Sequence, residues 1–201
     1  RTHLEDSIAL GNAHKFQSAG LTALMVPRVA NYIYVAWPLW LLGFPDQALH
    51  KTRESIALAQ EVGHPFSLAV AATWAAVLHD LRGEDESVQE YAAMAERLSR
   101  EQGFATTAAG GMILQGWALA RRGVLEEGVQ QMTAGLRAWR QAGSELFQYW
   151  HLLIARGHAL TGHIDKGLTQ LDEAFAIVQT SGEVMWQPEL YRLKGELLLE
   201  A

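Results

Sequence analysis

Apolar residues recur along most of the chain at the spacing of an α-helix, and pairs of glycines interrupt them at regular intervals. The first glycine of each pair is Gly43, Gly83, Gly123 and Gly162, and the second is Gly63, Gly103, Gly143 and Gly182. The two series keep the same period, and no strand-like alternation lies between the glycines. A repeat of roughly 40 residues with this character is typical of a solenoid of helical hairpins.

The pattern predicts two helices in each repeat. First helices are expected over residues 27–42, 64–81, 105–121 and 144–160, and second helices over 46–62, 85–102, 125–142 and 165–181. Each second helix has an acidic residue near its start, where a carboxylate suits the helix dipole. Each hairpin ends at a glycine that can adopt the left-handed conformation of a helix cap. We therefore predict repeats at 27–63, 64–103, 104–143 and 144–182.

The two ends of the chain depart from this period. Residues 7–10 share the tetrapeptide SIAL with residues 55–58, so residues 1–10 are expected to be the end of a preceding repeat. Residues 11–26 form an irregular connection, which is either a binding element or a surface excursion. Residues 183–201 are expected to form the first helix of a truncated repeat. The whole chain, 1–201, is predicted to be a single domain.

Very small residues fall at three fixed distances from the first glycine of each repeat. Where two helices cross closely, only small side chains let the backbones approach, so these positions predict the contact between the helices of a hairpin. They are Ala36, Ala76, Gly116 and Ala155; Ala48, Gly128 and Gly167, with the larger Val88; and Ser55, Ala95, Gly135 and Ala174. This spacing resembles the tetratricopeptide repeat, except that the period of that repeat is shorter. We predict an all-α, right-handed superhelix of antiparallel helical hairpins.

The composition fits a folded domain and argues against nucleic acid as a partner. Of the 201 residues, 49% are hydrophobic and 19% are charged, with a formal net charge of −6. Without clustered Lys and Arg, this charge argues against a nucleic-acid surface. The chain has no cysteine, which excludes disulfides and thiolate metal sites. Neither a long apolar run nor a leader pattern occurs, so we expect a cytoplasmic chain without a membrane partner.

The sequence contains one weak candidate for a catalytic motif. The chain contains no phosphate-binding loop, nucleophile elbow or zinc-protease motif. His79 and Asp80 resemble the core of a metal-dependent phosphohydrolase motif, but no further ligand set accompanies them, and a packed helix residue is favoured. We therefore predict no enzymatic activity, no cofactor and no metal site within these residues.

Aromatic residues suggest a binding surface instead. By resemblance to tetratricopeptide proteins, two columns of the first helices face a concave groove. Aromatic side chains there could hold a peptide helix or a planar ligand, and arginines could bind a carboxylate or phosphate. Alternatively, Trp37 and Trp40 pack against residues 11–26 and belong to the core. The candidate groove residues are Trp37, Trp40, Trp117, Arg121, Tyr149 and Arg156.

Four stretches resemble the C-terminal tetratricopeptide-like region of large bacterial signalling proteins. They are WLLGFPDQAL at 40–49, HPFSLA at 64–69, GWALA at 116–120 and ELYRLKGELL at 189–198. In that family a class III adenylate/guanylate cyclase domain and a STAND-type ATPase module usually precede the repeats. The resemblance implies a non-catalytic sensor or interaction arm that binds a protein segment or a small effector. The alternative is a self-association scaffold that forms a homo-oligomer through its aromatic surface or through Leu190, Leu193 and Leu197 of its terminal helix.

Overall fold

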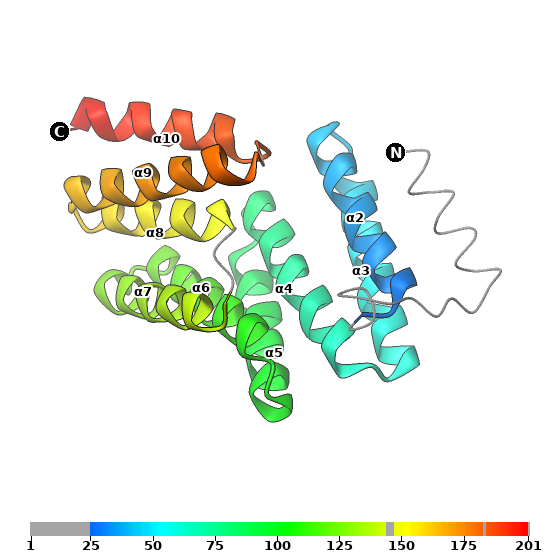
Figure 1. Ribbon diagram of the computed structural model, residues 1–201. Helices are drawn as coiled ribbons and strands as arrows, with labels where there is room; N and C mark the ends of the chain where they lie inside the picture. Colours follow the sequence, from blue (N-terminus) through cyan, green and yellow to red (C-terminus); the bar gives the residue numbers. More distant parts are fainter. Residues whose placement is uncertain (1–24, 144–146, 183, 201) are drawn as a thin grey trace. The chain divides into compact units, whose positions relative to one another are not determined.

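The computed structural model describes residues 25–143, 147–182 and 184–200, and the regular structure in these ranges is entirely α-helical (Figure 1). The predicted segment 1–10 and nearly all of the connection 11–26 lie outside the described residues. None of the described helices combines the length and apolarity needed to cross a membrane. The helices are α2 (Pro27–Leu41), α3 (Pro45–Val62), α4 (Pro65–Arg82), α5 (Asp85–Gln102), α6 (Ala105–Arg121), α7 (Leu125–Gln141), α8 (Gln148–Leu160), α9 (Ile164–Ser181) and α10 (Gln187–Glu200).

The glycine turns lie where the sequence predicts them. All eight glycines of the two series have positive φ, between 65° and 91°, a conformation that glycine adopts without steric penalty. At the end of α4, for example, the backbone N–H groups of Gly83 and Glu84 donate to the carbonyls of Asp80 and His79. These bonds satisfy carbonyls that the helix end would otherwise leave unpaired.

The helix bounds follow the predictions closely, with small shifts. Helices α2, α3 and α4 each begin at a proline, because its fixed φ suits the first helical position and its missing N–H is not needed there. Helix α3 therefore begins at Pro45 rather than at Asp46. Helix α8 begins at Gln148 rather than at 144, and residues 144–146 lie outside the described ranges.

The chain forms two compact units, residues 1–108 and 109–201. In the first unit, α2 packs on α3, α4 packs on α5, and α4 also contacts α2 and α3. Its buried core contains Val35, Leu39, Ala48, Leu49 and Leu78, with the partly buried rings of Tyr32 and Trp40 against it. In the second unit, α8 packs on α9, and the neighbouring helices α7 and α10 pack against this pair.

Within the second unit the predicted small residues do lie at close helix crossings. A Cβ atom added to Gly116 would lie 2.6 Å from the carbonyl oxygen of Gly128, and one added to Gly128 would lie 2.5 Å from that of Gly116. A Cβ on Gly135 would lie 2.7 Å from the side chain of Ile113, nearer the start of α6. Helices α6 and α7 are therefore antiparallel and in backbone contact. The predicted all-α arrangement of consecutively packed helices is confirmed for the described residues.

The prediction that Leu190, Leu193 and Leu197 form an uncovered face is wrong. All three side chains are buried, because α10 packs them against α9 and α8 of the same chain. Leu197 lies against Gly167 of α9, where a Cβ would be only 2.9 Å from the leucine Cδ1. The small residue on α9 thus makes room for the terminal helix. The large apolar residues that α10 does expose are Tyr191, Leu198 and Leu199, and the ring of Tyr191 lies 4.7 Å from that of Phe175 on α9.

Candidate binding surfaces

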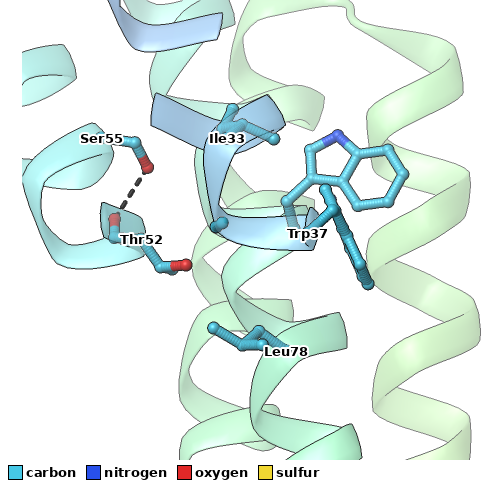
Figure 2. A pocket seen from close by; sticks show the side chains of 7 residues that line it. Ile33, Trp37, Thr52, Ser55 and Leu78 are labelled. Carbon is cyan, nitrogen blue, oxygen red and sulfur yellow. Dashed lines mark hydrogen bonds between the residues drawn. The ribbon is translucent and has the colours of Figure 1, made fainter. Parts of the chain in front are cut away.

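Trp37 is a buried part of the first unit. Its ring meets that of Trp74 edge-on, with centroids 5.1 Å apart and planes at 78°. Both rings line a cavity of about 10 Å³ among α2, α3 and α4 (Figure 2). This volume holds about one water molecule. On the cavity wall, the hydroxyls of Thr52 and Ser55 donate to backbone carbonyls 3.0 and 2.7 Å away. The cavity is thus a small packing defect, too small for a ligand.

Trp40 lies one turn further along α2 and is half-buried. It packs against the core cluster that contains Val35 and Leu39. These contacts fit the alternative that Trp37 and Trp40 belong to the core. Any packing of the two indoles on residues 11–24 lies outside the described residues.

The remaining predicted groove aromatics, in the second unit, are also buried. Trp117 has its ring beneath the guanidinium of Arg121, with the Cζ atom 5.9 Å from the ring centroid. Tyr149 lies in an aromatic cluster, 4.4 Å from the ring centroid of Trp186 and 5.8 Å from that of Trp150. Trp117 and Tyr149, which the sequence predicts to face a groove, are therefore not accessible to a ligand in this structure. Their ring faces are used for packing within the chain.

Arg156 has an acceptor within the chain. Its guanidinium donates to the carboxylate of Glu189 on α10, and Nε of Arg192 donates to the same carboxylate over 2.7 Å. The hydrogen bonds from Arg192, with the charge and hydrogen bond of Arg156, hold the pKa of Glu189 below its ordinary value. The structure therefore gives Arg156 the role of a bridge between α8 and α10. Within the second unit, Trp117, Tyr149 and Arg156 are thus engaged in contacts inside the chain.

The pair His79 and Asp80 lies in the last turn of α4. His79 is buried, stacks on Tyr91 at 5.2 Å, and has Nδ1 2.5 Å from the carboxylate of Glu84. Burial would raise the pKa of Glu84, but hydrogen bonds from Arg82 and His79 outweigh it and lower the pKa. Among the described residues, no group of three or more His, Asp or Glu side chains could hold a metal ion. These contacts fit the interpretation that His79 is a packed residue of its helix.

A second polar cluster, which the sequence did not indicate, joins α7, α8 and α9. The buried His151 has Nδ1 3.1 Å from the side-chain oxygen of Gln170 and 3.3 Å from the carboxylate of Glu173. Arg140 donates to the same carboxylate over 2.6 Å. Burial lowers the pKa of His151, while Glu173 opposes this effect. The cluster connects three helices and leaves the imidazole little access to solvent.

Among the described residues of the first unit, the turn between α2 and α3 is the clearest exposed apolar feature. Leu41, Leu42 and Phe44, here called the turn surface, are between 40% and 63% exposed. The corresponding positions of the later repeats carry more polar residues, such as Arg82 at the end of α4 and Glu84 after it. The apolar string at 40–45 carries this signal in the sequence. Exposed apolar groups gathered in this way mark interaction sites.

The comparisons with known proteins leave the family open. No protein-family model matches the chain. The chain is similar to an uncharacterized protein of Rhizobium meliloti (strain 1021), with 23% identity over 178 residues. The similarity covers 87% of this chain and 17% of the relative, so the chain spans about a sixth of the relative's length.

Proposed function

We propose that this chain is a non-catalytic binding module that recognises a protein segment through the turn surface. The supporting observation is the exposure of Leu41, Leu42 and Phe44 at one end of a helical hairpin. Sites for small effectors are usually concave pockets, whereas a turn of this kind projects from its hairpin. A protein segment is therefore favoured over a small effector.

The rim of the turn surface indicates what the partner should offer. The side chain of Asp46 is 94% exposed, and the guanidinium of Arg82 lies 3.6 Å from its carboxylate. A partner with apolar side chains next to a Lys or Arg would bury the leucines and face the Asp46 carboxylate. Charge complementarity of this kind contributes mainly to specificity and to the rate of association.

The wider context is part of the same proposal. The module is a right-handed, tetratricopeptide-like superhelix whose period is longer than that of the tetratricopeptide repeat itself. It serves as the interaction arm of a bacterial signalling protein with cyclase and ATPase domains. The regular spacing of the positive-φ glycines supports the repeat. The relative's much greater length is compatible with additional domains.

Photo-crosslinking tests the binding site in cells that produce the full-length protein. A photoreactive residue at position 42 should give a defined adduct with another protein, and Phe44→Asp should abolish this adduct. The matched control is position 160, since Leu160 is exposed at the equivalent α8–α9 turn. Equal adducts at both positions, or none at position 42, would contradict the proposal. An adduct of two copies of the protein would support self-association instead.

Self-association is the second candidate function, and one observation favours it. The inner leucines of α10 are covered within the chain, so the terminal face that the sequence predicts for a dimer is not available. Tyr191, Leu198 and Leu199 of the same helix are exposed.

A further inference from the structure

The turn surface between α2 and α3 lies beside a second turn of the same unit. Every residue from 41 to 47 is exposed, and this stretch contains both the turn surface and Asp46. The guanidinium of Arg82, in the last turn of α4, lies 3.6 Å from the Asp46 carboxylate. The α4–α5 turn therefore borders the turn surface on its Asp46 side. Both turns lie at helix ends, whereas neighbouring hairpins of a helical array pack along helix sides, so a further hairpin would leave this surface open.

The two neighbouring turns of the first unit are strongly acidic. The windows 40–47 and 80–87 together contain five carboxylates and one basic residue, which gives a net charge of −4. The equivalent windows of the second unit, 120–127 and 159–166, each contain equal numbers of acidic and basic residues, with histidine neutral. The concentration of negative charge is thus specific to the first unit. Its carboxylates, here called the acidic rim, are Asp46, Asp80, Glu84, Asp85 and Glu86.

The helix dipole explains only part of the acidic rim. A carboxylate in the first turn of a helix is stabilised by the dipole, and Asp46, Asp85 and Glu86 have such positions in α3 and α5. Helices α7 and α9 also carry first-turn carboxylates, yet basic residues in the same turns balance them. The dipole therefore accounts for a carboxylate in each turn, but not for the lack of compensating Lys and Arg in the first unit.

The single basic residue of these two turns is less exposed than the carboxylates it contacts. The side chain of Arg82 is 18% exposed, compared with 36% for Glu84 and 94% for Asp46. Nε of Arg82 donates to Glu84 over 2.7 Å, so one guanidinium is shared between two carboxylates. Glu86, in the next helix, is exposed as well. The rim therefore presents negative charge to solvent and keeps its positive charge against the protein.

An apolar surface with an acidic border limits the chemistry of its partner. The negative rim would repel nucleic acids and anionic lipid surfaces. The regular structure of the described residues is entirely helical, so this part of the chain offers no sheet edge to which an extended segment could add as a strand. A helix, by contrast, satisfies its own backbone and presents apolar side chains three or four positions apart, with charged side chains beside them.

We propose that the turn surface binds a basic amphipathic helix of another protein. The apolar face of that helix would cover Leu42 and Phe44, and its Lys or Arg side chains would face the acidic rim. This inference rests on the proposed function and adds the class of partner. The turn surface supplies the area that becomes buried, while the rim contributes mainly to specificity and to the rate of association.

Photo-crosslinking of charge variants in the full-length protein tests this inference. With the photoreactive residue at position 42, Asp46→Lys combined with Glu86→Lys should lower the adduct yield at least about fivefold, since each exposed charge pair changes affinity by up to about fivefold. The matched control is Glu126→Lys combined with Glu127→Lys. It makes the same change in net charge at exposed first-turn positions of α7, and it should leave the yield unchanged.

A milder pair of substitutions guards against misfolding. Asp46→Asn with Glu86→Gln removes the same charges without reversing them, and should lower the yield in the same direction by about twofold or more. The cross-linked segment, located by mass spectrometry, should carry Lys or Arg within four residues of the attachment point. An adduct that is lost in Phe44→Asp but unaffected by either pair of rim substitutions would overturn this inference and retain the proposed function. A cross-linked segment without Lys or Arg would do the same, whereas the absence of any adduct at position 42 would overturn both.

Discussion

Glycine has two distinct structural roles in this chain. At the ends of helices glycine adopts positive φ, and it is needed there for the backbone conformation. Inside helices the φ of glycine is ordinary, and glycine is needed there because its missing side chain leaves space for a second backbone. The sequence spacing separates the two sets, because two turn glycines recur in every repeat, while Gly116 and Gly128 fall at positions predicted for helix contacts.

A matched pair of alanine substitutions tests the second role. Gly116→Ala should destabilise the fold by about 1–3 kcal/mol, because the new Cβ would overlap backbone atoms of α7 that cannot rotate away. Gly195→Ala should stabilise it by up to about 1 kcal/mol, because the helix gains propensity and nothing is displaced. Urea unfolding at low protein concentration measures both. Equal changes in the free energy of unfolding would contradict the α6–α7 crossing.

The buried His151 should make stability depend on pH. Burial lowers its folded-state pKa below the ordinary value of 6.5, so below pH 6.5 the unfolded chain binds the proton more readily than the folded one. Stability is then complete above pH 6.5 and falls as the pH drops towards the folded pKa. His158, whose pKa burial also lowers, contributes in the same range. The groups facing His151 are Gln170, Glu173 and Arg140.

His151→Gln should therefore reduce the slope of unfolding free energy against pH below 6.5. Glutamine cannot be protonated but can still bond to Gln170. Denaturant titrations at a series of pH values provide the measurement. An unaltered slope in His151→Gln, with the slope reduced in His158→Gln, would show that His151 is not the group responsible.

At the scale of the element, α10 carries a buried leucine and an exposed leucine at neighbouring positions. Leu197→Ala should destabilise the chain by about 2–5 kcal/mol, since the side chain is buried against Gly167 of α9. Leu198→Ala, next to it but exposed, should change stability by no more than about 0.5 kcal/mol. Thermal melts of the two variants compare them directly. Similar losses would mean that α10 does not pack on α9 as described.

Helix positions were predictable because local rules determine them. Proline at a first turn and glycine at a cap each act on a few neighbouring residues, so the bounds of α5 and α6 agree with the sequence to the residue. The exposure of a side chain depends on every element that packs around it. The sequence position of Tyr149 predicts the face of the helix on which it lies. It does not predict that Trp186, which precedes α10, covers the ring of Tyr149.

At the scale of the whole molecule, helix α6 belongs to both compact units. It runs without interruption over Ala105–Arg121, and the boundary between the units falls after residue 108. A helix forms cooperatively, and in α6 the carbonyls of the first turn, which belongs to the first unit, accept from N–H groups of the next turn, which belongs to the second unit. Neighbouring elements of repeat proteins are coupled through their contacts in the same way. We therefore expect the described part of the chain to unfold as one cooperative array.

Hydrogen exchange with mass spectrometry, in a Gly116→Leu variant, tests this coupling. The substitution lies in the second unit, where leucine would collide with the backbone of α7. If the array is cooperative, exchange should accelerate in α4 and α5 of the first unit as well as in α6 and α7. Ala76→Leu, a buried site in α4, is the reciprocal variant and should accelerate exchange in α6 and α7. Acceleration confined to the unit that carries each substitution would show two independent domains, and the single domain that the repeat pattern predicts would then be wrong.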